Sequence, residues 1–239
     1  MTQSATSPIT TYEARRGEIE AYFDRTAAVT WQRLTSDAPV SGIRATVRAG
    51  RDRMRATLLS WLPQDLTGCR LFDAGCGTGA LAIAAAERGA SVVAIDLSPT
   101  LIGFARERAA SSGVLDQIDF RAGDMLAPPP GRFDHIVAMD ALIHYRGPDM
   151  ASMVASLAAR ADRSIIFTYA PRTPALTAMH AVGRLFPRAD RAPAIEPIHG
   201  ARLSSLLSNA PALSGWCAGR ETRITSGFYM SCAKELVPA

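Results

Sequence analysis

The chain of 239 residues is 48% hydrophobic and 20% charged, and its length suits one domain with an appended piece of about 50 residues. Its four cysteines have neither C-x-x-C spacing nor closely spaced histidine partners, which argues against a disulfide framework and a structural zinc site. The net charge is +4, but dense basic runs are absent and only 7% of residues are aromatic, so nucleic-acid binding is not favoured. The N-terminus lacks a signal-peptide pattern and the longest apolar run is too short to span a bilayer, so we expect a cytoplasmic protein.

The first part of the chain, residues 1–62, is expected to form an N-terminal helical arm or lid. Residues 1–11 show no regular pattern. Residues 12–34 follow a helical pattern in which Ile19 and Tyr22 share one face.

A strongly amphipathic helix is expected over residues 43–62, where Met54 and Leu58 belong to an apolar stripe at helical spacing. Pro63 and Gly68 end this segment. The other faces of the helix carry four arginines, which we interpret as a solvated surface. They are Arg44, Arg48, Arg51 and Arg55.

From Gly68 onward, strand patterns alternate with helix patterns, which indicates a parallel sheet covered on both faces. The expected strands cover residues 69–74, 91–96, 117–121, 134–140 and 163–169. The expected helices cover residues 78–88, 98–112 and 149–161.

The C-terminal part departs from this alternation. Residues 171–200 are rich in proline and arginine and are expected to form a cap insertion, followed by a helix at 201–208. Two strands, at 215–221 and 224–233, are joined by a tight turn near Thr222 and should pair antiparallel at the sheet edge. The expected fold is therefore an α/β, Rossmann-like domain over residues 63–239, mostly parallel with an antiparallel edge strand.

A glycine-rich loop between the first strand and the next helix is the most informative segment. It contains Gly75, Gly77 and Gly79, and glycines allow a sharp turn and close approach of the backbone to a ligand. In an open α/β sheet this turn lies at the carboxyl ends of the strands, where ligands bind. The same letters also satisfy a looser dinucleotide pattern, so a nicotinamide cofactor must be considered.

Acidic residues at successive strand ends favour a different cofactor. Asp73 stands two residues before the first glycine. A negative charge there would not favour an anionic pyrophosphate, but it would attract the cationic sulfonium and amino groups of a different cofactor. Asp96 is placed to accept hydrogen bonds from ribose hydroxyls, and Asp124 is placed to meet an adenine amino group. This set resembles the class I S-adenosylmethionine-dependent methyltransferases, and the resemblance adds neighbouring positions to the expected cofactor site. These are Leu97, Met125 and Asp140.

The segment after the fourth strand bears on the methyl acceptor. Enzymes that methylate bases usually carry an Asp/Asn-Pro-Pro-aromatic segment there, which holds an extruded base. Here the segment reads Asp140-Ala-Leu-Ile-His144-Tyr145, so the base-flipping interpretation loses its main support. A histidine at the rim of the sheet, below the expected methyl group, is instead a candidate for the acceptor site.

Scattered motifs resemble the magnesium-protoporphyrin IX O-methyltransferases of chlorophyll and bacteriochlorophyll synthesis. They cover most of the chain, although residues after Phe23 show less of the family's pattern, so the shape of the lid is open. The matching pieces are Glu20-Ala-Tyr22-Phe23, Asp73-Ala-Gly-Cys-Gly-Thr-Gly79, Leu142-Ile-His144-Tyr145, Phe167-Thr-Tyr-Ala-Pro171-Arg-Thr173, Gly183-Arg-Leu-Phe-Pro187, Gly215-Trp216 and Thr225-Ser-Gly-Phe-Tyr229.

The resemblance implies methyl transfer from S-adenosylmethionine to a propionate carboxylate of magnesium-protoporphyrin IX, giving the monomethyl ester and S-adenosylhomocysteine. His144 and Tyr22 would be the catalytic pair, positioning the carboxylate rather than removing a proton. Magnesium would belong to the substrate, so we expect no metal site in the protein. The implied substrate-binding residues are Tyr145, Arg184, Arg188 and His199.

Two alternatives remain open from the sequence. One is an O-methyltransferase with another small acceptor, such as a quinone precursor. The other is a methyltransferase-like binding module without activity, against which the intact acids and glycines argue. The expected partners are the porphyrin and, further, a magnesium chelatase subunit, with at most peripheral membrane contact.

Overall fold

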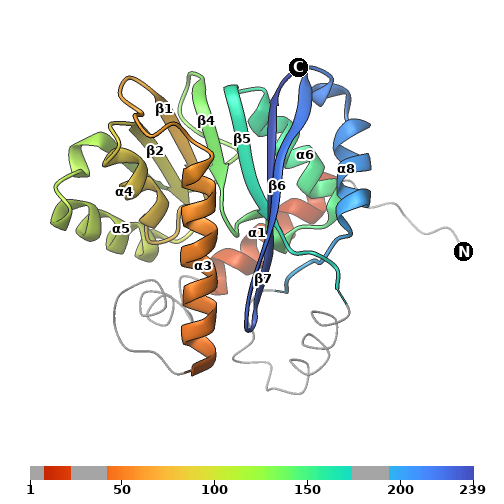
Figure 1. Ribbon diagram of the computed structural model, residues 1–239, viewed down its shortest axis with the longest axis horizontal. Helices are drawn as coiled ribbons and strands as arrows, with labels where there is room; N and C mark the ends of the chain where they lie inside the picture. Colours follow the sequence, from red (N-terminus) through yellow and green to blue (C-terminus); the bar gives the residue numbers. More distant parts are fainter. Residues whose placement is uncertain (1–7, 23–41, 174–193) are drawn as a thin grey trace, which may run out of the picture.

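The computed structural model describes residues 8–22, 42–173 and 194–239. Within these residues, a seven-stranded sheet with the order β3-β2-β1-β4-β5-β7-β6 forms the middle layer (Figure 1). β1 to β5 are parallel, whereas β7 runs antiparallel to both β5 and β6. The expected α/β class and the antiparallel edge are therefore confirmed. The strands are β1 Arg70–Ala74, β2 Ser91–Asp96, β3 Ile118–Ala122, β4 Phe133–Ala138, β5 Ala161–Tyr169, β6 Trp216–Ser226 and β7 Tyr229–Pro238.

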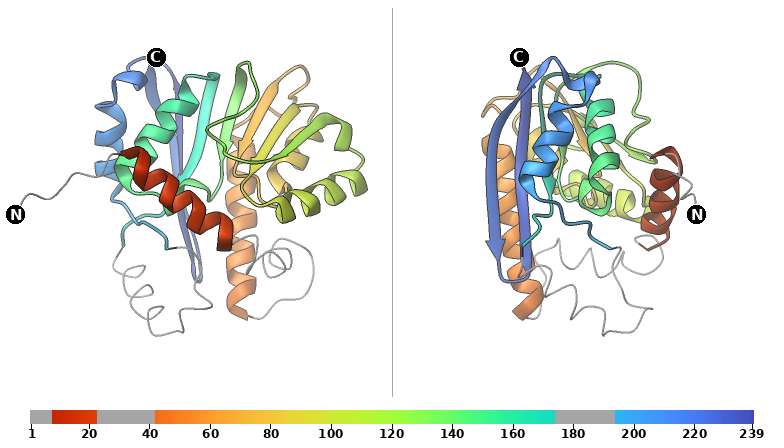
Figure 2. Two further views of the ribbon diagram at one scale, coloured as in Figure 1. Left: turned by 180° about the vertical axis from the view of Figure 1, so that it is seen from behind. Right: turned by 90° about the vertical axis from the view of Figure 1, so that its right-hand side faces the viewer.

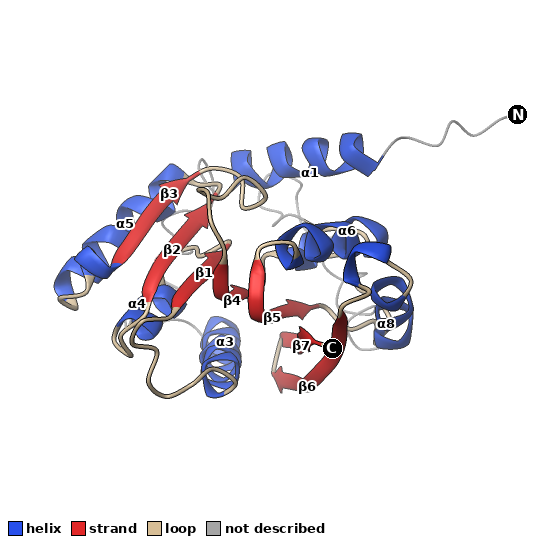
Figure 3. Cartoon of the chain, turned by 90° about the horizontal axis from the view of Figure 1, so that it is seen from above, coloured by secondary structure: helices blue, strands red, loops and turns tan. Residues whose placement is uncertain are grey.

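Helices cover both faces of the sheet, as Figure 3 shows from above. α3, α4 and α5 pack on one face, and α1, α6 and α8 lie on the other, with α1 in contact with α6 (Figure 2). The α-helices are α1 Pro8–Tyr22, α3 Gly42–Ser60, α4 Ala80–Ala86, α5 Pro99–Ser111, α6 Gly147–Ala158 and α8 Gly200–Ser208. Short 3-10 turns are η2 Leu115–Gln117, η3 Leu142–His144 and η5 Pro211–Leu213.

The apolar stripe of α3 packs on the sheet as its spacing predicts. Met54 and Leu58 are fully buried in one core cluster with Leu71 of β1 and Ile166 of β5. α3 is thus part of the layered core, although it lies within the predicted 1–62 arm. The boundaries of the arm and of the 171–200 cap stay predictions.

Local sequence explains the start of α5 well. Ser98 is extended and its side chain accepts a hydrogen bond from the Leu101 amide, while Pro99 occupies the first turn, where no amide partner is needed. The helix expected from residue 98 is confirmed with this cap.

The turn between the last two strands lies elsewhere than predicted. β6 and β7 remain paired up to Ser226 and Tyr229, so the two loop residues are Gly227 and Phe228 rather than residues near Thr222. Gly227 adopts a φ of 54°, which favours glycine in a two-residue hairpin turn. The predicted turn was wrong because residues 222–223 include neither glycine nor proline. The strand β6 therefore continues through them to Ser226.

Several other predicted boundaries are also wrong, each by a few residues. α1 begins at Pro8, inside the segment expected to be irregular, and residues 23–34 of the expected helix lie outside the described residues. β4 ends at Ala138 and not at Asp140. Ala161 begins β5 instead of ending α6, because it pairs with Phe133 of β4 in the sheet. Patterns of apolar residues do not mark such ends.

Across the three described stretches, no helix is both long and apolar enough to cross a membrane. The same residues contain no group of three or more histidine, cysteine or acidic side chains that could hold a metal ion.

Candidate active site

A cavity of about 240 Å³ lies at the carboxyl ends of β1, β2 and β4. The chain leaves β1 toward β2 and β3 on one side, and it continues through β4 and β5 on the other, so this is the switch point of the sheet, where open α/β folds bind ligands. Most predicted site residues come together here. Those that line the cavity are Tyr22, Asp73, Gly75, Gly77, Asp96, Leu97, Asp124, Met125, Asp140, His144 and Tyr145.

Of the described site residues that were predicted, His199 and Gly79 do not line this cavity, and two further predicted residues cannot be placed. His199 is exposed immediately before α8 and does not line the cavity. Gly79 is buried at the start of α4, where its φ is 75° and an added Cβ would come within 3.1 Å of Phe120 and 3.0 Å of Ala105, so backbone conformation and packing account for this glycine. Arg184 and Arg188 lie outside the described residues.

The first two glycines of the loop shape the floor of the cavity. Gly75 has a φ of 80°, and a Cβ on it would lie 2.4 Å from the Cβ of Ala141, so the loop after β4 packs directly on this backbone. Gly77 has a φ of 54° and donates its amide to Asp96 Oδ2 over 2.8 Å. Side chains at either position would close the approach to a ligand.

Asp73 is a buried acid with one carboxylate oxygen that accepts no hydrogen bond from the described residues. Its side chain is 1% exposed, its Oδ2 has no hydrogen-bond partner among the described residues, and it lines the cavity. Burial raises the pKa of Asp73 to about 7, against the effect of the Ala82 amide that it accepts. A buried oxygen without a donor fits a cationic ligand group at this point of the cavity.

Asp96, at the end of β2, is held by backbone amides. Besides the Gly77 amide, Asp96 accepts the Ser98 amide on Oδ1 over 3.0 Å, and burial raises its pKa. These bonds fix the carboxylate at the cavity wall. The predicted contact with ribose hydroxyls stays a prediction.

Asp124, after β3, is engaged by α1. Its carboxylate accepts the Tyr12 hydroxyl, Arg16 Nη1 over 2.7 Å and the Leu126 amide over 2.8 Å. Burial and the hydrogen bond to Asp124 raise the pKa of Tyr12. An adenine amino group at Asp124 would have to share or replace these donors.

The segment that follows Asp140, residues 141–145, forms the opposite wall, and we call it the acceptor loop. His144 and Tyr145 are buried in it, and the Tyr145 hydroxyl has no partner among the described residues. His144 Nδ1 lies 3.3 Å from the Ala194 carbonyl, while the His144 carbonyl accepts Arg15 Nε over 2.9 Å. Tyr12 stacks on Tyr145 with ring centroids 5.3 Å apart. The acceptor loop is therefore covered by α1.

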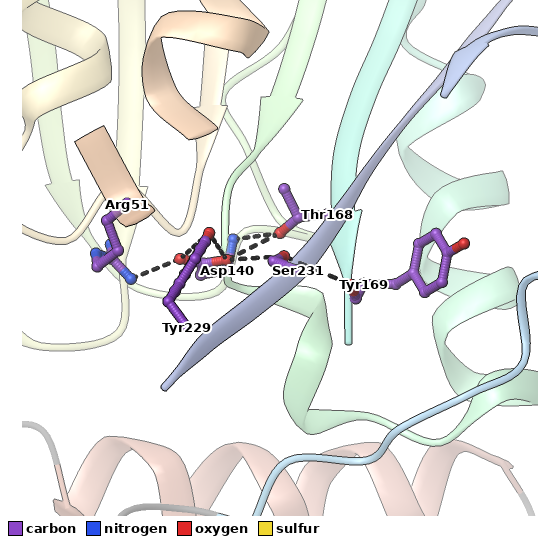
Figure 4. A network of polar contacts seen from close by, with 6 residues as sticks. All are labelled: Arg51, Asp140, Thr168, Tyr169, Tyr229 and Ser231. Carbon is purple, nitrogen blue, oxygen red and sulfur yellow. Dashed lines mark hydrogen bonds and ion pairs between the residues drawn. The ribbon is translucent and has the colours of Figure 1, made fainter. Parts of the chain in front are cut away.

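Asp140 connects the acceptor loop to three other elements (Figure 4). Its Oδ2 pairs with Arg51 Nη1 of α3 over 2.6 Å. The hydroxyls of Tyr229 and Thr168 donate to the carboxylate over 3.1 and 3.2 Å. The Ser231 hydroxyl lies 3.4 Å from Oδ1. The predicted contact of Asp140 with the cofactor stays a prediction.

The interpretation of the α3 arginines as a solvated surface is wrong for three of them. Arg48, Arg51 and Arg55 line the cavity, and the Arg51 side chain is only 17% exposed. Arg55 pairs with Asp52 over 2.9 Å. Helical spacing places these arginines on one face but does not reveal that the face borders a cavity, because that depends on how α3 packs.

Sequence reasoning also missed Tyr12, Arg15 and Arg16 of α1 and Tyr229 of β7. The signal was weak: the three α1 residues lie in no matching motif, and Tyr229 ends the Thr225–Tyr229 piece, to which no chemical role was attached. A run of tyrosine and arginine at the start of an amphipathic arm could only have suggested polar contacts with the acids at the strand ends.

The sheet order and the glycine loop are those of the class I S-adenosylmethionine-dependent methyltransferases, and a methyltransferase-domain model matches residues 71–161. A narrower model, described as magnesium-protoporphyrin IX methyltransferase C-terminus, matches residues 138–238. The chain belongs to the magnesium-protoporphyrin IX methyltransferase family, as the following relatives show.

The magnesium-protoporphyrin O-methyltransferase of Rhodobacter capsulatus is 45% identical over 228 residues, which cover 95% of this chain and 98% of that protein. The enzyme of the same name from Synechocystis is 31% identical over 222 residues, covering 92% and 94%. A crystal structure of the Synechocystis magnesium protoporphyrin IX methyltransferase with bound SAH matches with a TM-score of 0.82 at 30% identity, covering 94% of this chain and 100% of that one.

Proposed function

We propose that this chain transfers a methyl group from S-adenosylmethionine to a propionate carboxylate of magnesium-protoporphyrin IX. The observation that carries the proposal is one cavity lined by the buried Asp73, whose Oδ2 has no partner among the described residues, and by the buried His144 and Tyr145. When bound, S-adenosylmethionine supplies the methyl group and the sulfonium leaving group. Family membership supports this acceptor over a quinone precursor, and the retained acids and glycines support an enzyme over a binding module.

The acceptor needs positioning more than activation. A propionate has a pKa near that of Glu, about 4.3, so it is already ionised at neutral pH and needs no strong base. The protein's task is to hold one carboxylate oxygen in line and to exclude water. We assign this positioning to His144 and to Tyr22 of α1, with the Tyr145 hydroxyl as a further donor. Magnesium enters as part of the substrate.

The second propionate needs a cation, and α3 carries candidates at the cavity. Arg48 lines it one turn before Arg51, in the N-terminal half of α3. A guanidinium suits a carboxylate well because its planar donors match the two oxygens. The earlier candidates Arg184 and Arg188 stay predictions.

The activity is tested by incubating the purified chain with magnesium-protoporphyrin IX and S-adenosylmethionine labelled in the methyl group. We expect a labelled monomethyl ester on chromatography. His144→Ala and Tyr22→Phe should lower turnover strongly while leaving S-adenosylhomocysteine affinity near wild type. A chain that binds S-adenosylhomocysteine but labels only a quinone precursor would contradict the proposed acceptor.

The arginine assignment is tested by charge reversal. Arg48→Glu should raise the porphyrin KM several-fold without changing S-adenosylhomocysteine affinity, because only the acceptor loses its counter-charge. Arg53→Glu is the matched control, since Arg53 is exposed on the same helix and does not line the cavity. Equal porphyrin KM values for the two variants would show that Arg48 does not bind the second propionate.

Two finer expectations about partners belong to the proposal: a magnesium chelatase subunit that hands over the porphyrin, and peripheral membrane contact. Phe228, 51% exposed at the tip of the β6–β7 hairpin, is one apolar group available for such a contact. Binding of wild type and Phe228→Ser to liposomes, and to purified chelatase subunits, would test both.

A further inference from the structure

Asp140 has a backbone conformation that needs support. Its φ is 55°, and among the described residues it is the one non-glycine residue with positive φ. Aspartate and asparagine tolerate this left-handed region better than most side chains, but such a conformation persists only where the surroundings hold it. Asp140 stands between the end of β4 and the acceptor loop, so its backbone sets the direction in which that loop leaves the sheet.

The surroundings of Asp140 supply that support from distant parts of the chain. Its side chain is 5% exposed, and its carboxylate contacts Arg51 of α3, Thr168 of β5 and Tyr229 of β7 (Figure 4). The Asp140 amide also donates to Thr168 Oγ1 over 2.7 Å. Thr168 therefore fixes both the backbone and the carboxylate, and the ion pair with Arg51 joins them to α3.

The acceptor loop has little freedom between Asp140 and His144. Ala141 packs on Gly75, and Leu142–His144 forms one turn of 3-10 helix. The Ile143 carbonyl accepts the Glu196 amide over 2.8 Å. With only three residues between them, a change in the backbone at Asp140 displaces His144.

Resting on the proposed function, we propose that Asp140 is a positioning residue for methyl transfer: its contacts with α3, β5 and β7 hold the acceptor loop so that His144 stays at the cavity. Asp140 then acts through His144 rather than through the cofactor. A direct cofactor contact makes a different prediction, because it requires Asp140 variants to lose S-adenosylhomocysteine affinity.

Three substitutions in the full-length chain separate the backbone from the carboxylate. Asp140→Ala removes the carboxylate and disfavours the positive φ, Asp140→Gly removes the carboxylate but permits the φ, and Asp140→Asn keeps a carbonyl oxygen and tolerates the φ. We expect kcat with the porphyrin to fall at least about tenfold in the alanine and glycine variants and to be partly restored in the asparagine variant. S-adenosylhomocysteine affinity, measured by calorimetry, should stay within about threefold of wild type.

The coupling to His144 is tested by a double-mutant cycle. If Asp140 acts through His144, adding Asp140→Ala to His144→Ala should lower kcat less than about twofold further. Hydrogen–deuterium exchange gives a readout independent of turnover: the amides of the acceptor loop should exchange faster in Asp140→Ala than in wild type. Asp116→Ala, at an exposed acid in η2, is the control for both measurements.

Additive effects in the cycle, wild-type kcat in Asp140→Gly, or an S-adenosylhomocysteine affinity lowered in step with kcat would each overturn the positioning role. Should the Asp140 variants fail to fold, Tyr229→Phe removes one hydroxyl donor and must still lower kcat with unchanged S-adenosylhomocysteine affinity. Failure of the proposed function is distinguishable, because wild type itself would then leave the porphyrin unmethylated while the exchange data still report on the loop.

Discussion

At the scale of a single residue, we predict that Asp73 makes ligand binding depend on pH. Burial raises its pKa to about 7, so below that pH the carboxyl group is mostly protonated and cannot attract a cation. The ammonium group of S-adenosylhomocysteine, bound beside Asp73, would lower the pKa of the carboxyl group again, so binding would release a proton. We therefore expect S-adenosylhomocysteine affinity to be highest above pH 7 and to fall, by up to about tenfold per pH unit, as the pH drops below it.

Calorimetry across this pH range, in buffers of different ionisation enthalpy, would measure both the affinity and the proton release. Asp73→Asn is the control: it should bind weakly and show a flat profile. The same slope in Asp73→Asn as in wild type would assign the pH dependence to another group.

Asp96 makes a second prediction at the residue scale. A charge-assisted hydrogen bond contributes about 1.5–3 kcal/mol, so Asp96→Ala should weaken S-adenosylhomocysteine binding markedly. The variant also loses the bond to the Gly77 amide and thereby loosens the glycine loop. Unchanged affinity by calorimetry would remove Asp96 from the cofactor site.

At the scale of elements, the contact between α3 and the β6–β7 hairpin decides how the cavity is walled. Gly50 of α3 faces Tyr229, and an added Cβ would lie 2.5–2.7 Å from three atoms of that side chain. Gly227 of the hairpin turn is equally close to Thr46. This close approach lets Arg51 reach Asp140 beside Tyr229.

Gly50→Ala should therefore lower the free energy of unfolding by about 1–3 kcal/mol, because overpacking outweighs the better helix propensity of alanine. Gly103→Ala is a matched control in the middle of α5, where an added Cβ meets nothing within 4 Å. That change should raise stability by about 0.4–1 kcal/mol. Urea denaturation of both variants measures their free energies of unfolding. Equal changes at the two glycines would show that the α3–hairpin contact accommodates the added methyl group without loss of stability.

At the scale of the whole molecule, the cavity is lined by segments that are far apart in the sequence. α1 binds Asp124 and the acceptor loop, while α3 binds Asp140, so a ligand at the cavity contacts segments from both faces of the sheet. Ligand binding should thus stabilise the fold as a unit.

Saturating S-adenosylhomocysteine at about 100 times its Kd should add about 2.7 kcal/mol and raise the Tm by about 5–10 °C. Differential scanning calorimetry with and without ligand measures this shift. Asp73→Asn should show a much smaller shift at the same ligand concentration. A wild-type transition that splits in two would contradict a single cooperative unit.

The order of strands and helices, the glycine loop and the acids at the strand ends followed from sequence alone, because they depend on local periodicity, on glycine's backbone freedom and on the rule that parallel strands end at one edge. Residues such as Asp73 and His144 could be placed at that edge for the same reason. Only the tertiary structure decided that Arg51 and Tyr229 meet at Asp140, that Tyr12 and Arg16 reach Asp124, and that Gly79 packs against Phe120 while His199 stays outside the cavity. These contacts join residues distant in the chain, and they depend on how helices pack against the sheet, which a one-dimensional pattern of apolar residues does not specify.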